Sequence, residues 1–183
     1  MKRLFIAIKI DPDQHFIDVY QALRNDLAHE KIKWVPEENL HLTLRFLGEM
    51  NENNIDRIIK AIAVVTSVRQ FDFNVQNTGI FGSSYRPKVI WFGTNPKEYL
   101  QKLAGSINQS LSRIGYTNDR QNFVPHLTAG RIKELSDKTL FQNIISKYKM
   151  QFLQKIKVSE IILFESVLLK QGATYRTVDI FKL

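Results

Sequence analysis

The sequence predicts an α+β fold in which two related lobes each contribute one strand to a shared cleft. Three observations favour this class. Strand-like and helix-like segments are mixed along the chain, with hairpins that are typical of antiparallel sheet. No low-complexity linker interrupts the 183 residues, a length that suits one domain. The tripeptide His-Leu-Thr occurs twice, at 41–43 and 126–128. We therefore interpret residues 1–183 as a single two-lobed domain.

The first half of the chain alternates strands and helices. The expected elements are a strand at 3–10, a helix from Asp11, a short strand at 32–35, a strand at 39–48 and a helix from Asn51. Asp11 is expected to cap the first helix, with Pro12 at its first helical position. Asn51 is expected to cap the second helix, whose apolar stripe runs from Ile55 to Val65.

The second half continues the same mixture of elements. The expected elements are a hairpin of strands at 71–81 and 88–93, a helix from Pro96 to Gly115, a strand at 123–131, a helix at 136–149 and two or three strands in the last thirty or so residues. Glycine is the usual residue just beyond the end of a helix, so Gly115 marks where the third helix stops.

Residues 39–48 alternate between two kinds of side chain. One face of this strand is predicted to carry Leu40, Leu42, Leu44 and Phe46, and the other His41, Thr43 and Arg45. The same spacing at 126–128 predicts that His126 and Thr128 also share a face. Each leucine between a His and a Thr would then turn into the core and anchor its strand.

Composition excludes several classes of chemistry. The chain has no Cys, which excludes disulfides, thiolate nucleophiles, Cys-based zinc sites and iron–sulfur clusters. Its apolar fraction of 44% and charged fraction of 24% are ordinary for a globular protein. The formal net charge is +8, which favours polyanionic partners such as RNA. A solvated basic surface is the alternative interpretation of that charge.

The first ten residues resemble the start of a signal peptide, with two basic residues before an apolar run. However, Lys9 interrupts the run, Asp11-Pro12 follow it, and no small-residue cleavage site is present. A first strand is therefore the better interpretation. No stretch approaches the roughly 18 apolar residues of a membrane span, so we expect a cytoplasmic protein that has no membrane partner.

The doubled motif suits acid–base chemistry without a metal or cofactor. Imidazole has an ordinary pKa of about 6.5, so one His can be neutral while another is protonated. Such a pair can deprotonate water and protonate a leaving oxygen at a phosphodiester. Hydroxyls of Thr43 and Thr128 can donate hydrogen bonds to the phosphate oxygens. Neither copy has a further His, Asp or Glu at a familiar ligand spacing, so no metal is expected.

The motifs His41-Leu42-Thr43-Leu44 and His126-Leu127-Thr128-Ala129 resemble the paired His-x-Thr-x motifs of the 2H phosphoesterase superfamily. Within it, the chain is most similar to the bacterial and archaeal RNA 2′,3′-cyclic phosphodiesterases, formerly called 2′-5′ RNA ligases. The similarity extends over nearly the whole chain. It includes Arg3-Leu4-Phe5, Trp34-Val35-Pro36, Asn39-Leu40, Phe46-Leu47-Gly48, residues 86–91 and Tyr175.

This resemblance implies a two-lobed fold with pseudo-two-fold related, largely antiparallel sheets, flanking helices and a central cleft. It implies hydrolysis of RNA 2′,3′-cyclic phosphate ends to 2′-phosphomonoesters, without a cofactor. It also implies His41 as proton donor, His126 as proton acceptor, and Thr43, Thr128 and Arg131 as substrate-binding residues. The partner would be an RNA or oligonucleotide that ends in a 2′,3′-cyclic phosphate, and we expect a monomer.

Several alternatives remain open at this point. Strict alternation places Arg131 on the face opposite His126, so it reaches the phosphate only if the strand ends, twists or bulges near Gly130. Arg45 is either a further phosphate contact or a tolerated arginine at the end of a strand. Tyr175 and Phe123 are weaker candidates for the cleft lining. At the level of function, 2′-5′ ligation, small cyclic nucleotides as substrates, and a non-catalytic RNA-binding module remain alternatives.

Overall fold

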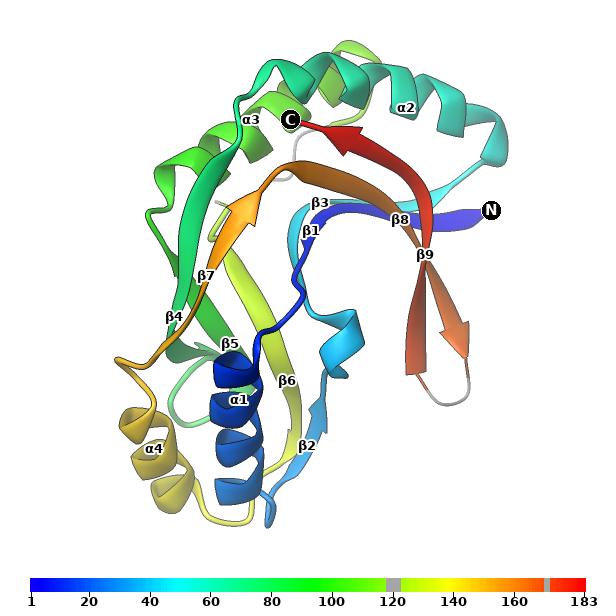
Figure 1. The fold of residues 1–183 in the computed structure, drawn as a ribbon. Coiled ribbons are helices and arrows are strands. Elements are labelled where there is room, and N and C mark those ends of the chain that lie inside the picture. The colour runs from blue at the N-terminus through cyan, green and yellow to red at the C-terminus, as the bar shows by residue number, and fades with distance from the viewer. Residues whose placement is uncertain (118–122, 170–171) are drawn as a thin grey trace.

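The structure is a computed structural model that describes residues 1–117, 123–169 and 172–183. Within these ranges it contains four α-helices and nine β-strands (Figure 1). The helices are α1 (Gln14–Asp26), α2 (Ile55–Ala63), α3 (Glu98–Arg113) and α4 (Lys138–Lys147). The strands are β1 (Lys2–Lys9), β2 (Lys31–Trp34), β3 (His41–Met50), β4 (Phe71–Gly82), β5 (Pro87–Asn95), β6 (His126–Glu134), β7 (Phe152–Val158), β8 (Glu160–Leu169) and β9 (Gly172–Lys182).

All the described strands belong to one curled antiparallel sheet. Its order is β7-β4-β5-β6-β3-β1-β8-β9, and β2 pairs with the outer part of β6. Four strands lie on each side of the junction between β6 and β3, where Leu42 pairs with Leu127. The sheet therefore has two similar halves that meet at the central residues of the two His-Leu-Thr copies. The predicted antiparallel α+β fold is confirmed, although its two sheets are joined into one.

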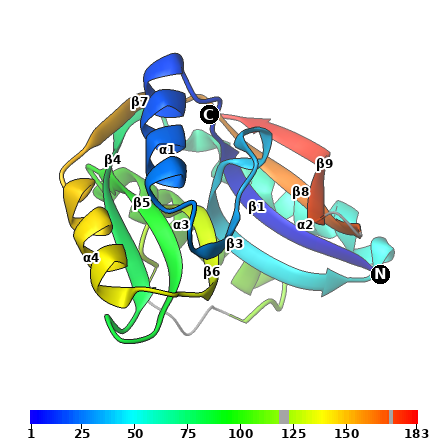
Figure 2. The ribbon, with the colours of Figure 1, turned by 90° about the horizontal axis from the view of Figure 1, so that it is seen from below.

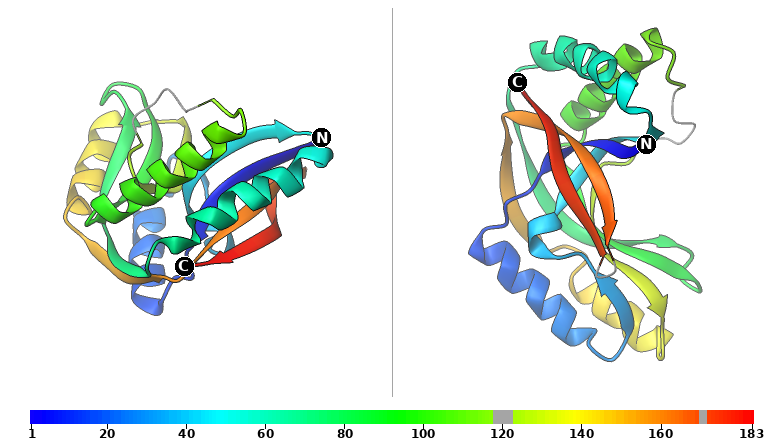
Figure 3. Two further views of the ribbon diagram at one scale, coloured as in Figure 1. Left: turned by 90° about the horizontal axis from the view of Figure 1, so that it is seen from above. Right: turned by 90° about the vertical axis from the view of Figure 1, so that its right-hand side faces the viewer.

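The helices cover the two halves from opposite ends of the molecule (Figure 3). Helix α1 contacts β7 and α4 contacts β4, whereas α3 contacts β3 and α2 contacts β9. Figure 2 shows α1 and α4 together, beside the β4–β7 half of the sheet. The side chains of Leu42 and Leu127 have no exposed surface and join one continuous apolar core. None of the helices described is long and apolar enough to span a membrane.

The predicted element boundaries need small corrections at the helix starts. Helix α1 is capped by Asp13, whose carboxylate accepts a hydrogen bond from the Phe16 N–H at 2.8 Å. The predicted cap, Asp11, instead forms an ion pair with Lys9 at 2.7 Å. Asn51 caps a 3₁₀ turn at Glu52–Asn54 rather than α2 itself. Helix α3 begins at Glu98, not at Pro96, and Gly115 follows its end with a φ of +91°.

Glu30 fixes the start of α4 against the end of α1. Its buried carboxylate accepts hydrogen bonds from the backbone N–H groups of Ser136 at 2.6 Å and Asp137 at 3.1 Å. Burial alone would raise the pKa of Glu30, but these hydrogen bonds outweigh that effect and lower it. Glu30 therefore remains ionised in the folded protein and stabilises it.

Glu30→Ala is expected to lower the free energy of unfolding by about 1–3 kcal/mol at neutral pH, because two N–H groups lose a charged acceptor. Because the pKa of Glu30 is lower in the folded state, this stabilisation is present above the pKa of the unfolded state. It is lost as the pH falls through the pKa of the folded state. Urea unfolding at about pH 7 and about pH 4 measures both effects. Glu49→Ala, at an exposed position on β3, is the control, and equal stability of the two variants at neutral pH would contradict this role.

Candidate active site

The two His-Leu-Thr copies lie side by side on β3 and β6. Leu42 pairs with Leu127 in antiparallel register, so His41 lies opposite Thr128 and Thr43 lies opposite His126. The two leucines are fully buried, whereas the two histidines and two threonines are partly exposed. The four polar residues therefore share the face of the sheet that is turned away from the core. We call this face the cleft face.

Both imidazole rings are oriented by the same kind of hydrogen bond. His41 Nδ1 lies 2.7 Å from the carbonyl oxygen of Asn39, and His126 Nδ1 lies 2.7 Å from that of Val124. A carbonyl oxygen only accepts, so each Nδ1 carries the proton and donates. In each ring Nε2 is then the nitrogen available to a ligand. The two halves of the sheet are thus alike even in the tautomer of the histidine.

A β-bulge follows each threonine at the equivalent position. Thr128 pairs with Trp91 and Gly130 with Ile90, which leaves Ala129 as the extra residue of β6. A bulge reverses the alternation of side chains beyond it. Arg131 therefore joins His126 and Thr128 on the cleft face. The strand was expected to end, twist or bulge near Gly130 if Arg131 is to reach this face, and the structure shows a bulge.

The matching bulge in β3 corrects two predictions. Thr43 pairs with Ala7 and Arg45 with Ile6, so Leu44 is the extra residue of β3. Arg45 consequently lies on the core side, where its guanidinium donates to the carbonyl oxygen of Thr117 after α3. Its predicted position on the same face as His41 is wrong.

Phe46 takes the place on the cleft face that alternation assigned to Arg45. It was predicted to lie on the face of the core leucines, but the bulge turns it outward, with 58% of its surface exposed. Its ring lies 6.0 Å from that of Phe5. Phe46 stands three residues after Thr43, as Arg131 stands three residues after Thr128. The two halves of the site thus place an aromatic ring and a cation at equivalent positions.

The environment lowers the pKa of both histidines. Burial is the largest cause of the lowered pKa of His41. The Asn39 hydrogen bond opposes this shift, and the positive charges of His126 and Arg131 add to it. Burial is also the largest cause of the lowered pKa of His126. The Val124 hydrogen bond opposes this shift, and the charge of Arg131 adds to it. Both rings are therefore neutral at pH 7 before a ligand binds. An anionic ligand between them would favour protonation of one ring.

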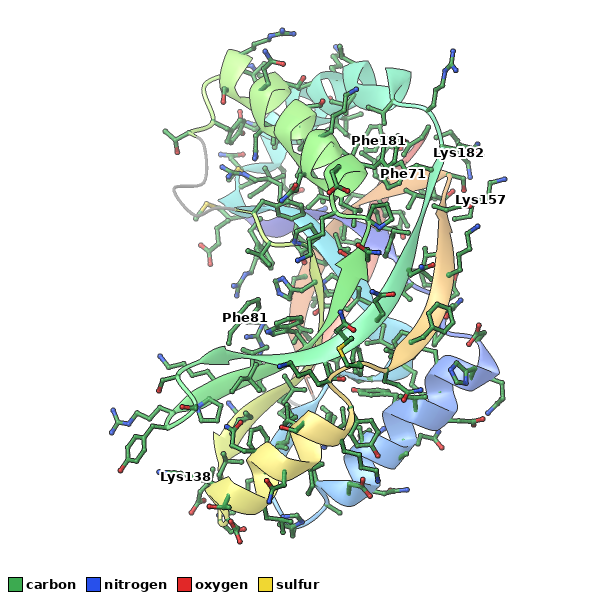
Figure 4. The ribbon with its side chains drawn as sticks, turned by 90° about the vertical axis from the view of Figure 1, so that its left-hand side faces the viewer. Phe71, Phe81, Lys138, Lys157, Phe181 and Lys182 are labelled. Carbon is green, nitrogen blue, oxygen red and sulfur yellow. The ribbon has the colours of Figure 1, made fainter. Side chains whose placement is uncertain are left out.

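Aromatic side chains support each histidine of the site. The His41 ring lies 5.1 Å from Phe5 and 5.0 Å from Tyr175, and the His126 ring lies 4.7 Å from Phe81. Figure 4 shows Phe81 on the opposite side of the β4–β5 hairpin from α4. Tyr175 was among the candidates from the sequence, whereas Phe5 and Phe81 were missed, because both are placed by strand pairing. Phe123, the other weak candidate, packs against the main core instead.

A pocket of about 240 Å³ opens beside His41. It is lined by the end of β1 at Lys9, by residues 38–41, by Phe164 of β8, and by Tyr175 and Thr177 of β9. Burial raises the pKa of the Tyr175 hydroxyl, and the charges of Arg131 and Arg3 oppose that rise. Arg131 thus contributes to lowering the pKa of His41, His126 and Tyr175 alike, in keeping with its place on the cleft face.

Comparison with known proteins identifies relatives over most of the chain. The model of the LigT-like phosphoesterase family matches residues 8–91 and 93–175, and each segment contains one His-Leu-Thr copy. The chain is 31% identical over 180 residues to an RNA 2′,3′-cyclic phosphodiesterase of Archaeoglobus fulgidus, covering 98% of this chain and 99% of the relative. It is 33% identical over 144 residues to one of Thermotoga maritima, covering 78% of this chain and 75% of the relative.

Solved structures show the same fold. The TT0787 protein of Thermus thermophilus superimposes with a TM-score of 0.81 and 22% identity, covering 99% of this chain and 97% of that one. LigT of E. coli in its apo form gives a TM-score of 0.71 at 23% identity, covering 100% of this chain and 97% of that one. The family match spans both halves of the sheet, as the resemblance of the two motifs had indicated. The chain belongs to the LigT-like phosphoesterase family.

Proposed function

We propose that this protein hydrolyses the 2′,3′-cyclic phosphate at the end of an RNA to a 2′-phosphomonoester. The observation that carries the proposal is the pair of equivalent histidines on one face, each with Nδ1 bound to a carbonyl and Nε2 available. Relatives of near-full length that bear the name RNA 2′,3′-cyclic phosphodiesterase support the substrate class. The formal charge of +8 suits a polyanionic substrate.

In the proposed reaction, His126 is the general base and His41 the general acid. Neutral His126 takes a proton from water through Nε2 while the water oxygen bonds to phosphorus. The bond from phosphorus to O3′ breaks, and His41 Nε2–H gives its proton to O3′. The product keeps the phosphate on O2′, and both histidines are restored when His126 releases one proton to solvent and His41 takes one up. The step requires one neutral and one protonated ring.

Thr43, Thr128 and Arg131 are proposed to hold the phosphate during this step. The threonines lie opposite the histidines in the register of β3 and β6, so their hydroxyls flank the position between the two rings. The bulge at Ala129 brings Arg131 to the same face. A guanidinium donates to two phosphate oxygens at once, and it stabilises the negative charge that develops on them.

Several finer properties belong to the same proposal. All steps use side chains of this chain, so the reaction proceeds without a metal or cofactor. A 5′-hydroxyl in place of water would give a 2′-5′ linkage by the same step, in which His126 deprotonates the hydroxyl and His41 protonates O3′ as it leaves. Residues 1–183 act as one two-lobed catalytic unit, since each lobe supplies one histidine. We further propose a monomer that works in the cytoplasm, where RNA ends are found.

Phe46 is expected to stack on the terminal nucleobase. Its ring is 58% exposed on the cleft face, and aromatic stacking contributes about 1–3 kcal/mol per base. Phe46→Ala should therefore lower kcat/KM for a 2′,3′-cyclic nucleotide about 5- to 150-fold, mainly through KM. Steady-state kinetics measure the change, with Phe46→Tyr as the matched control that keeps the ring. A Phe46→Ala variant with wild-type KM would contradict the stacking.

Product analysis of an oligonucleotide that ends in a 2′,3′-cyclic phosphate tests the proposed function. In the presence of EDTA, the wild-type protein should convert it to the 2′-phosphate. Formation of the 3′-phosphate would mean that the wrong oxygen leaves, and loss of activity in EDTA would contradict the metal-independent mechanism. RNA binding with no turnover would instead identify a non-catalytic RNA-binding module.

A further inference from the structure

The pocket beside His41 combines an aromatic wall with a polar rim. Phe164 is 7% exposed and its ring lies 6.2 Å from that of Tyr175, so the two rings form one wall. Glu38, Thr177 and Lys9 supply polar groups at the rim and are exposed. The volume of about 240 Å³ is below the roughly 300–1,000 Å³ of sites that take drug-sized ligands. These features fit one planar, hydrogen-bonding group such as a nucleobase.

The pocket and Phe46 lie on opposite sides of Phe5. The pocket is lined by residues that precede β3, by His41 itself, and by Lys9, which pairs with His41. Phe46 pairs with Phe5 of β1, and Phe5 pairs on its other side with Phe164, which lines the pocket. Neighbouring strands lie about 4.8 Å apart, so the backbones of Phe46 and Phe164 are separated by roughly 10 Å, and the ring of Phe5 lies between the two side chains. One nucleobase cannot occupy both places.

Lys9 lines the pocket, and two further cations, Lys33 and Arg131, lie on the cleft face. Lys33 Nζ lies beside Gly172 at the start of β9, and β2 pairs Lys33 with Arg131 on the same face of the sheet. Lys9 Nζ forms an ion pair with Asp11 at 2.7 Å, but both side chains are exposed. Such a pair contributes little and can exchange for a phosphate. The phosphate that links two nucleotides would meet a favourable potential here.

We infer that this pocket binds the nucleobase of the nucleotide next to the cyclic-phosphate end, so that the enzyme recognises at least a dinucleotide. The inference rests on the proposed function, which places the cyclic phosphate at the histidines and the terminal base on Phe46. Tyr175 then contacts His41 with one edge and contributes to the wall of the neighbouring subsite. Occupation of the pocket would also hold Tyr175 against His41.

Three substrates with the same terminal nucleotide test this inference. They are a 2′,3′-cyclic mononucleotide, the corresponding dinucleotide, and a dinucleotide whose 5′ residue lacks its base. Stacking and hydrogen bonding of one base should raise kcat/KM about tenfold for the complete dinucleotide over the abasic one. In Thr177→Trp the indole fills the pocket, and the ratio of kcat/KM for the complete dinucleotide to kcat/KM for the abasic one should fall to about one.

Thr174→Trp is the matched control. Thr174 is exposed on the same strand, but it pairs with Val167 and alternates with Tyr175, so it faces away from the pocket. This variant should keep the preference for the complete dinucleotide. Glu38→Ala removes a rim acceptor and should lower the ratio about threefold, the worth of one modest hydrogen bond.

The outcomes separate the inference from the proposed function. If the wild-type protein hydrolyses all three substrates with equal kcat/KM, the pocket does not bind a base and the inference is overturned, while the proposed function stands. A Thr177→Trp variant that keeps the wild-type ratio overturns the inference as well. If the wild-type protein hydrolyses none of the three, the proposed function fails and the inference fails with it.

Discussion

His41→Ala and His126→Ala should each lower kcat/KM for a 2′,3′-cyclic phosphate by about 10²–10⁴-fold, the usual contribution of one proton transfer. The two rings are proposed to act in one step, as acid and as base. Loss of either ring leaves the other without its partner in that step, so kcat/KM of the double variant should be little lower than that of either single variant. Steady-state hydrolysis of a cyclic nucleotide by the three variants measures this non-additivity.

His15→Ala is the control for these substitutions. His15 lies on α1, where its Nε2 is 3.2 Å from the carbonyl oxygen of Phe152, and it has no place on the cleft face. Its removal should leave kcat/KM within about twofold of the wild-type value, since surface substitutions are usually within about 0.5 kcal/mol. Wild-type activity in either His41→Ala or His126→Ala would rule out the paired mechanism.

Arg131→Met should lower kcat/KM by about 10²–10³-fold, the usual cost of removing one donor to the developing charge. It should also shift the pH dependence. The positive charge of Arg131 contributes to the lowered pKa of His41 and of His126, because it disfavours each imidazolium. Without that charge both pKa values rise toward the ordinary value. Both limbs of the bell-shaped kcat/KM profile should therefore move to higher pH.

Two comparisons make the Arg131 prediction specific. Arg131→Lys keeps the charge but loses the fork of donors, so it should lose rate while the pH profile stays in place. Lys133→Met removes a charge two residues further along β6 and should change neither the rate nor the profile appreciably. A full pH–rate curve for each variant distinguishes these cases. An Arg131→Met variant with an unshifted profile would contradict the proximity of Arg131 to the two rings.

The sequence was sufficient to place the histidines because the pattern of His-Leu-Thr is local. Strand alternation depends only on neighbouring residues, and it correctly predicts that His41 and Thr43 share a face while Leu42 enters the core. The repetition of the tripeptide also predicted two equivalent strands. That these strands pair directly, leucine to leucine, is a long-range property that the structure adds.

The faces of Arg45 and Phe46 could not be predicted in the same way. A bulge is defined by how a strand pairs with its neighbour, and the extra residue at Leu44 appears only in the register of β3 with β1. For Arg131, the sequence indicated that the strand must end, twist or bulge near Gly130, without showing which of these occurs. The equivalence of the two bulges was visible only once both halves of the sheet were in place.

The aromatic side chains around the histidines could also not be predicted from the sequence. Phe5 and Phe81 lie in apolar strands, like many core residues, and only pairing and curvature bring them to the imidazole rings. The start of α1 shows a different difficulty, because Asp11 and Asp13 are both suitable caps. Asp13 takes that role, and Asp11 pairs with Lys9.

The measurement that tests the paired-histidine centre most directly is the hydrolysis of a cyclic substrate with sulfur in place of the bridging 3′ oxygen. A thiolate has an ordinary pKa near 8.5 and needs no proton to leave, so this substrate does not require the general acid. His41→Ala should hydrolyse it at a rate close to that of the wild-type protein, while His126→Ala should remain as impaired as on the oxygen substrate. Rescue of His126→Ala in place of His41→Ala would reverse the roles, and rescue of neither would contradict acid catalysis by this pair.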